Sequence, residues 1–223
     1  MHNKLFIVVL LVAAVFTPRE TAGQPNGAPV IFAERMPFAV LPESRLWLEG
    51  SANVVDFSCR ATEITTYGGL AGLDTLSRVP APHGDVMLEV HIPVDKLDCG
   101  RGGINRDMKN TLNFRQHPYI TYRLDRNQLM GLEVDDELFV FDISTWGGLT
   151  ISGNEKQEEI QVEGKFLGPW QFRIRGSHRI AMSEFGLTPP SPMMGLIKVD
   201  DTLVVHFDVT LCLRSCDTVV QLQ

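Results

Sequence analysis

The sequence has no apolar run long enough to cross a membrane as a helix. The longest run, Leu5–Phe16, has 12 residues, whereas a membrane-spanning helix needs about 20. Lys4 precedes this run and the small residues Thr21-Ala22-Gly23 follow it, which is the pattern of a cleaved secretory signal. No cysteine occurs before Cys59, so we expect no lipoprotein anchor. We therefore expect residues 1–23 to be a signal peptide and the protein to be periplasmic or secreted.

Positive charge and catalytic motifs are also scarce. The chain has 20 Lys and Arg against 27 Asp and Glu, a formal charge of −7, and nucleic acid binding needs clustered Lys and Arg. The sequence lacks the Gly-x-Ser-x-Gly, His-x-x-x-His and Cys-x-x-Cys patterns of nucleophile elbows and metal sites. Residues 100–103 are rich in glycine but lack the lysine of a phosphate loop. These absences predict no nucleic acid partner, no metal, no cofactor and no enzymatic activity.

Only four cysteines are present, and in an exported chain they indicate disulfides. Four cysteines allow three pairings. Cys212 and Cys216 are near neighbours in sequence, while Cys59 and Cys99 lie in separate predicted elements. We favour Cys59–Cys99 with Cys212–Cys216, and free buried thiols are the alternative.

Alternation of apolar and polar residues with a period of two dominates the chain from Ser44 onward. This pattern is typical of antiparallel strands with one apolar face. The alternating apolar residues are Leu46 and Leu48; Val55, Phe57 and Cys59; Val86, Leu88, Val90 and Ile92; Ile120, Tyr122 and Leu124; Phe172 and Ile174; and Leu203, Val205, Phe207, Val209 and Leu211. Together with Phe139–Ile151 and Ile160–Phe166, they predict eight or nine strands. Eight strands in a closed barrel leave room for side chains or for one small ligand.

Other segments lack this period. Residues 24–43 are rich in Pro, Gly and Ala and predict an extended leader. Residues 66–85 and 187–200 predict loops, and 125–128 predicts a turn. Residues 104–116 have helical spacing, with Asn105 as the predicted cap and Asp107 in the first turn.

Two short motifs carry a resemblance to a known family. They are Gly148-Leu-Thr-Ile-Ser-Gly153, followed by a second strand, and Met182-Ser-Glu-Phe-Gly-Leu187, followed by a long alternating strand. Residues 44–51, 53–60, 94–98 and 105–122 match in the same order. The sequence resembles the YceI-like family of bacterial lipid-binding barrels, although residues 154–157 replace the turn that usually follows the first motif.

The resemblance implies an all-β, lipocalin-like antiparallel barrel of about eight strands with one short helix near its mouth. It places this domain at residues 44–216, before a C-terminal tail at 217–223. It also implies a polyisoprenoid or another long-chain lipid as partner, and leaves a homodimer open. The implied lumen-lining residues are Val55, Phe57, Leu88, Val90, Leu112, Ile120, Tyr122, Leu149, Ile151, Phe172, Ile174, Phe185, Val205 and Phe207.

The same residue types also allow a purely structural interpretation. Each inward apolar side chain fits a packed core as well as an open lumen, so a filled barrel acting as a structural, stress or interaction module is the alternative. His178 falls in the inward phase with Phe172 and Ile174. It could be a hydrogen-bonded structural histidine, could turn outward at a bulge, or could contact a lipid head group. The inward set otherwise carries no charge, which argues against an enzyme that acts on the lipid.

Overall fold

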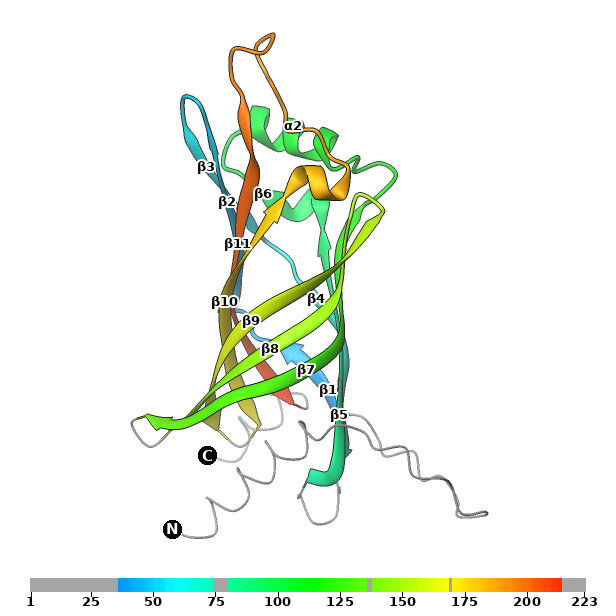
Figure 1. Cartoon of the computed structure of the whole chain (residues 1–223), viewed down its shortest axis with the longest axis vertical. Helices are drawn as coiled ribbons and strands as arrows, with labels where there is room; N and C mark the ends of the chain where they lie inside the picture. The colour runs from blue at the N-terminus through cyan, green and yellow to red at the C-terminus, as the bar shows by residue number, and fades with distance from the viewer. Residues whose placement is uncertain (1–35, 74–79, 136–137, 169, 214–223) are drawn as a thin grey trace.

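The computed structural model describes residues 36–73, 80–135, 138–168 and 170–213, and they form strands almost throughout (Figure 1). The strands are β1 Met36–Val40, β2 Arg45–Ala52, β3 Asp56–Ala61, β4 Thr65–Leu73, β5 Pro80–Pro93, β6 Leu97–Asp98, β7 Tyr119–Asp135, β8 Leu138–Ile151, β9 Asn154–Gly168, β10 Gln171–Ala181 and β11 Val199–Leu213. The helical elements are η1 Val94–Lys96, α2 Gly102–Thr111 and η2 Met182–Phe185.

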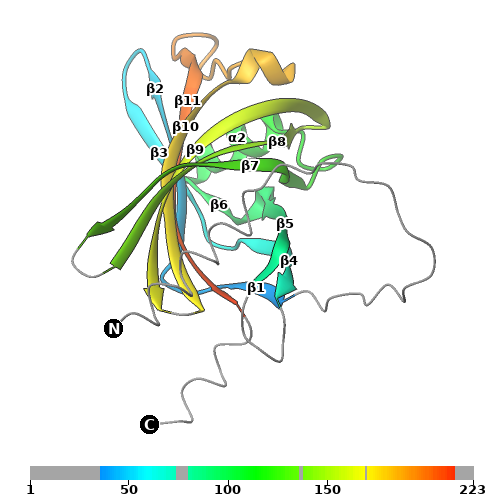
Figure 2. The same cartoon turned by 60° about the horizontal axis from the view of Figure 1, so that its bottom comes forward.

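Eight of these strands close into an antiparallel barrel. They follow the order β1-β4-β5-β7-β8-β9-β10-β11, and β1 pairs again with β11 to complete the ring. The prediction of a barrel of about eight antiparallel strands with one short helix is therefore confirmed. Closure pairs the strand edges that an open sheet would present to other chains. The helical elements α2 and η2 lie at one end, here called the helix end, and β1 lies towards the other (Figures 1 and 2).

The long strand β11 has two successive partners on the same edge. Residues 199–208 pair with β2, and residues 211–213 pair with β1. Between β1 and β2 the chain is held against β11 at Thr210, whose carbonyl accepts hydrogen bonds from the Leu41 amide at 2.9 Å and the Ser44 hydroxyl at 3.3 Å. The strands β3 and β6 extend the sheet beyond β2 at the helix end.

Several predicted breaks in the sheet are strands instead. β1 lies within the segment predicted as a leader, β4 and β5 occupy much of the predicted loop at 66–85, and β7 runs through the predicted turn at 125–128. Gly68, within the predicted loop at 66–85, lies in β4 with a φ of +119°, and a Cβ there would lie 2.1 Å from the Met87 carbonyl oxygen. The glycine therefore allows two strands to approach closely. Glycine is also common in turns, so the sequence alone does not distinguish the two cases.

The helix is shorter and starts earlier than predicted. α2 begins at Gly102 and ends at Thr111, and residues 112–116 form turns. Asn105 lies inside the helix and does not cap it, and no acidic residue lies in the first turn. The expected roles of Asn105 and Asp107 at the helix start are therefore wrong.

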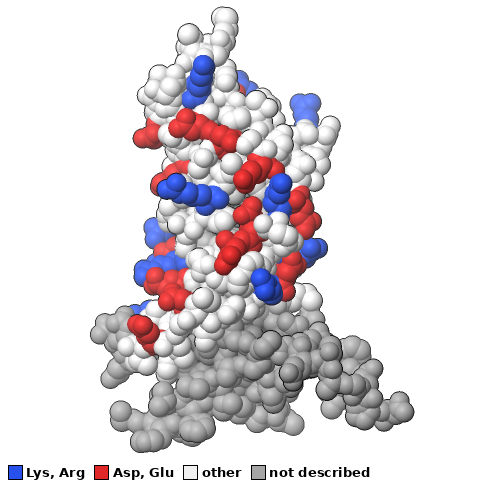
Figure 3. All heavy atoms as spheres, in the orientation of Figure 1, with Lys and Arg blue, Asp and Glu red and all other residues white. Residues whose placement is uncertain are grey.

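The outer face of the barrel carries interspersed positive and negative side chains over β8, β9 and β10 (Figure 3). On this face Arg173 pairs with Asp208, and Arg175 pairs with Glu163. Within the described ranges, no helix is both long and apolar enough to span a bilayer.

Candidate functional site: an apolar lumen with a polar belt

The two sequence motifs meet at the helix end. β8 and β9 are joined by a two-residue turn in which Ser152 and Gly153 have φ values of 49° and 80°, which favours glycine at the second position. Beyond the turn, the side-chain amide of Asn154 donates to the Phe185 carbonyl of η2 at 2.8 Å. Phe185 is fully buried and packs with Ile151. The motifs therefore build a packed core that lies across this end of the barrel.

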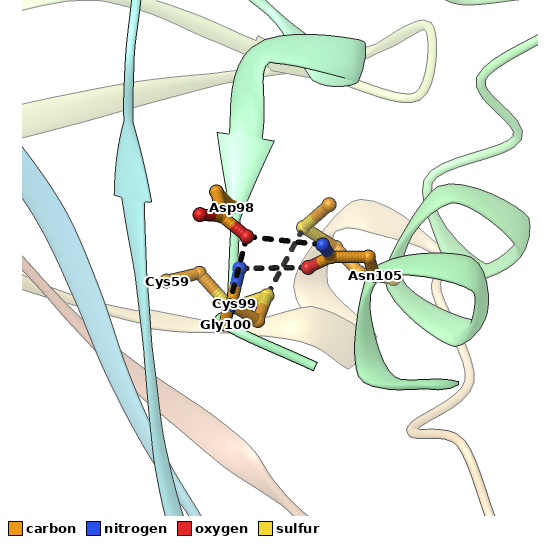
Figure 4. The surroundings of a disulfide bond; sticks show 6 residues. Cys59, Asp98, Cys99, Gly100 and Asn105 are labelled. Atoms are coloured by element: carbon orange, nitrogen blue, oxygen red, sulfur yellow. Dashed lines mark hydrogen bonds between the residues drawn. A yellow bond between two sulfur atoms is a disulfide. The ribbon is translucent and has the colours of Figure 1, made fainter. Parts of the chain in front are cut away.

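A disulfide anchors α2 beside that core. It joins Cys59 of β3 to Cys99, which lies between β6 and α2 (Figure 4). Asn105 of α2 accepts a hydrogen bond from the Cys99 amide at 2.7 Å and donates one to Asp98 at 3.1 Å. This bond, followed by one from the Gly100 amide, lowers the pKa of the Asp98 carboxyl. Asn105 therefore ties the helix to the sheet. The predicted partner of Cys212, Cys216, lies outside the described residues, so that pairing stays a prediction.

The described residues enclose one connected cavity of about 750 Å³ along the barrel. All fourteen residues predicted to line a lumen border this cavity, although Phe185 and Ile151 do so as members of the packed core, at 0% and 4% exposure. Asp107 and Thr111 of α2 border it at the helix end, together with Arg101, which precedes the helix. The cavity contradicts the alternative of an interior filled by the strands' own side chains. Contact of these residues with a ligand stays a prediction.

Inward aromatic rings lie over glycines of neighbouring strands. Phe141 is paired with Gly164, and Phe207 with Gly176. A Cβ built on Gly164 would lie 2.1 Å from the Phe141 ring, and one on Gly176 would lie 2.6 Å from the Phe207 ring. Because each glycine leaves room above the sheet, the ring packs against the backbone and does not extend across the lumen. This explains how a barrel with large inward side chains keeps open space.

One level of the lumen wall is polar. It comprises Tyr122 of β7, Thr145 of β8, Glu158 of β9 and His178 of β10, here called the polar belt. The Tyr122 hydroxyl donates to Thr145 Oγ1 at 3.2 Å, and the Thr145 hydroxyl donates to the Ile160 carbonyl at 3.0 Å. His178 Nε2 lies 2.9 Å from Glu158 Oε2. The expectation that the inward set carries no charge is therefore wrong.

Burial dominates the electrostatics of Tyr122. Desolvation raises the pKa of its phenol, the hydrogen bond with Thr145 opposes that rise, and the charges of Asp125 and Glu158 add to it. The side chains of His178 and Glu158 are only 20% and 17% exposed. Tyr122 is thus a neutral hydroxyl at physiological pH, next to a largely buried ionisable pair.

Sequence reasoning placed Tyr122 and His178 on the inner face but missed Glu158 and Thr145. Glu158 is in phase with Ile160 and Val162, two residues and four residues further along β9, and both border the cavity. Alternation counted backwards from Ile160 is the signal that would have found it. Among the described residues no group of three His, Cys, Asp or Glu side chains is arranged to hold a metal ion.

The fold and the cavity define a closed, hollow antiparallel barrel, and the comparisons with known proteins agree. The sequence pattern of the YceI-like domain matches residues 48–211. The chain belongs to this family. Among curated proteins, none matches the sequence significantly.

Solved structures share the fold at low sequence identity. A polyisoprenoid-binding domain of Saccharophagus degradans, implicated in plant cell wall breakdown, superposes with a TM-score of 0.60 at 14% identity, covering 80% of this chain and 99% of that one. BcnA of Burkholderia cenocepacia gives a TM-score of 0.57 at 15% identity, covering 75% of this chain and 96% of that one.

Proposed function

We propose that this protein is an exported lipid-binding barrel that sequesters or carries a polyisoprenoid or a similar amphiphile in its lumen, without catalysing a reaction on it. The observation that carries the proposal is the connected cavity of about 750 Å³ with a wall of Val, Leu, Ile and Phe side chains. Small-ligand sites are hollows of about 300–1,000 Å³ lined mainly by apolar side chains. Membership of the YceI-like family and the likeness to a polyisoprenoid-binding domain support the same ligand class.

The apolar wall can supply the binding energy. Covering ~400 Å² of a prenyl tail is worth ~10 kcal/mol at 25 cal/mol per Å². The loss of translational and rotational freedom offsets part of that gain. The predicted lining residues outside the packed core would provide this contact, Val90 and Ile174 among them.

Export is part of the proposal and depends on residues outside the described ranges. Residues 1–23 carry the pattern of a signal peptide, and the Cys59–Cys99 disulfide fits an oxidising compartment such as the periplasm or the extracellular space. Intact mass measurement of the protein from a periplasmic extract or culture medium tests this part. A processed chain that begins near Gln24 and carries disulfides supports export, whereas an uncleaved, reduced chain in the cytoplasm contradicts it.

The ligand itself is tested by organic extraction of protein purified from its native host, followed by mass spectrometry. We expect a co-purifying isoprenoid or a long-chain amphiphile. Lumen occupancy is tested separately with Ile174→Trp, which places an indole in the cavity, against Ser177→Trp, which lies on the exposed face of the same strand. We expect the first variant to lose prenyl binding and the second to retain it. A protein that carries no lipid and binds no prenyl probe would rule out the proposal.

A further inference from the structure

The polar belt interrupts the run of apolar side chains on four adjacent strands. Tyr122, Thr145 and His178 border the cavity. Glu158 reaches His178 from the inward phase of β9, so each of β7, β8, β9 and β10 contributes one polar side chain at this level. A barrel that only had to accommodate a hydrocarbon tail gains nothing from these groups, because burying polar atoms costs free energy unless they find partners.

The hydroxyl protons of the belt are already used within it. Tyr122 donates to Thr145, and Thr145 donates to the Ile160 carbonyl. His178 Nε2 and Glu158 Oε2 share one hydrogen bond, so these two side chains are partners of each other. The belt therefore presents the Tyr122 phenol oxygen to the lumen as an acceptor, and the Glu158 carboxylate reaches this level through its contact with His178.

A fifth polar side chain, that of Asn127, lies near the polar belt and also carries an acceptor oxygen. Asn127 of β7 borders the cavity and is paired with Thr145 in the sheet register. Its side-chain oxygen Oδ1 is buried and has no hydrogen-bond partner among the described residues. Buried polar atoms are almost always hydrogen-bonded in folded proteins. This oxygen is an additional acceptor without a donor.

We propose that the polar belt, with Asn127, is a subsite for a hydroxyl group of the ligand. The protein would then select an isoprenoid that ends in one or more O–H groups, such as a prenol or a hydroquinone, over the same tail ending in an ether, a carbonyl or a hydrocarbon. The inference rests on the proposed lipid-binding function and adds the chemical class of the ligand's polar group. It also orients the ligand, since the polar end lies inside the barrel wall.

Hydrogen bonding favours a ligand that ends in a hydroxyl and disfavours ligands with the same tail but no hydroxyl. An ether or a carbonyl oxygen has no proton to donate, so it leaves the Tyr122 phenol oxygen and Asn127 Oδ1 without a donor. Sites built to hydrogen-bond a hydroxyl reject analogues that lack it, because buried polar groups are then left unpaired. We expect at least about a tenfold preference for the hydroxyl form, the factor that one such bond typically provides.

The test compares geranylgeraniol with its methyl ether, which has the same tail and a blocked hydroxyl. Affinities of the processed, folded protein are measured by displacement of a fluorescent lipid. We expect the wild type to bind the alcohol at least about tenfold more tightly than the ether. Glu158→Gln removes the carboxylate beside His178 and should reduce that preference. The matched control is Glu163→Gln, on the same strand but paired with Arg175 on the outer face, and it should keep the preference.

Tyr122→Phe provides a second variant if Glu158→Gln does not fold, because it removes only the phenol oxygen. A wild type that binds alcohol and ether equally overturns the subsite and leaves the lipid-binding function intact. A preference that survives in both Glu158→Gln and Tyr122→Phe also overturns it. Binding of neither lipid by folded wild type contradicts the proposed function itself, so the two failures are distinguishable.

Discussion

The helix end and the middle of the barrel are built from the same residue types but differ in packing. At the helix end, Phe185 is 0% exposed and packs with Ile151 and Ile180, because η2 and the β8–β9 turn fold across the strands. In the middle, Phe207 lies over Gly176 and borders open space. The difference shows that the alternating pattern decides which face is apolar, whereas local elements and glycines decide whether that face is filled.

The largest expected effect is at the packed end. Phe185→Ala removes a fully buried ring and should lower the free energy of unfolding by about 3–5 kcal/mol, because it combines lost burial with a new cavity. Phe207→Ala serves as the matched change in the hollow region and should cost less than half as much, since its ring already borders the cavity. Urea unfolding of both variants measures the difference. Equal losses would mean that the two regions are packed alike.

The disulfide should have the next largest effect. Replacing Cys59 and Cys99 together with Ser opens a loop with a sequence separation of 40. The expected loss is about 2–4 kcal/mol, mainly through the greater freedom of the unfolded chain. Urea unfolding of the variant and the wild type, both without reductant, measures it. A loss well below 1 kcal/mol would indicate that Asn105 and the sheet hold α2 without the covalent link.

Sequence reasoning succeeded where one physical signal dominates. The apolar alternation through β5, β10 and β11 specifies inward and outward faces, because side chains of a strand point to opposite sides in turn. The motifs at 148–153 and 182–187 indicated the family, and the structure gives them a joint role in the packed helix end.

The features that could not be predicted from the sequence depend on contacts between segments that are distant in the chain. β1 looked like a leader because Met36–Val40 is too short for a periodic signal, yet pairing with both β4 and β11 makes it a strand. Glu158 was missed because a charged side chain gives no apolar signal, and its contact with His178 on the next strand accounts for its inward position. The openness of the lumen depends on pairs such as Phe141 and Gly164, which are set by register and not by composition.

Filling the hollow region by a single methyl group is the third test of the comparison. Gly164→Ala places a Cβ where the Phe141 ring lies, at 2.1 Å, and all the nearest atoms belong to that ring. The ring must therefore move, and we expect it to turn into the lumen. Stability should fall by about 1–3 kcal/mol, and prenyl affinity should fall with the available volume. Gly168→Ala, on the same strand with open space around it, is the control. Unchanged binding in Gly164→Ala would show that the ligand does not reach this level.

The smallest expected effect comes from a variant on the outer face. It tests whether the outer charges act independently of the lumen. Hydrogen bonding to Arg173 lowers the pKa of Asp208, so this carboxylate stabilises the fold above its unfolded pKa of about 3.9, and the contribution is lost as the pH falls through the lower folded value. Asp208→Asn should therefore cost up to about 1 kcal/mol at pH 7 and less at a pH near 2, because the contribution declines as the wild-type carboxyl takes up a proton. Urea midpoints at the two pH values measure this, with Asp56→Asn in the exposed β2–β3 hairpin as control.

Prenyl affinity at pH 7 should be unchanged in Asp208→Asn, because the side chain points away from the cavity. A loss of affinity would mean that the outer charges and the lumen are not independent.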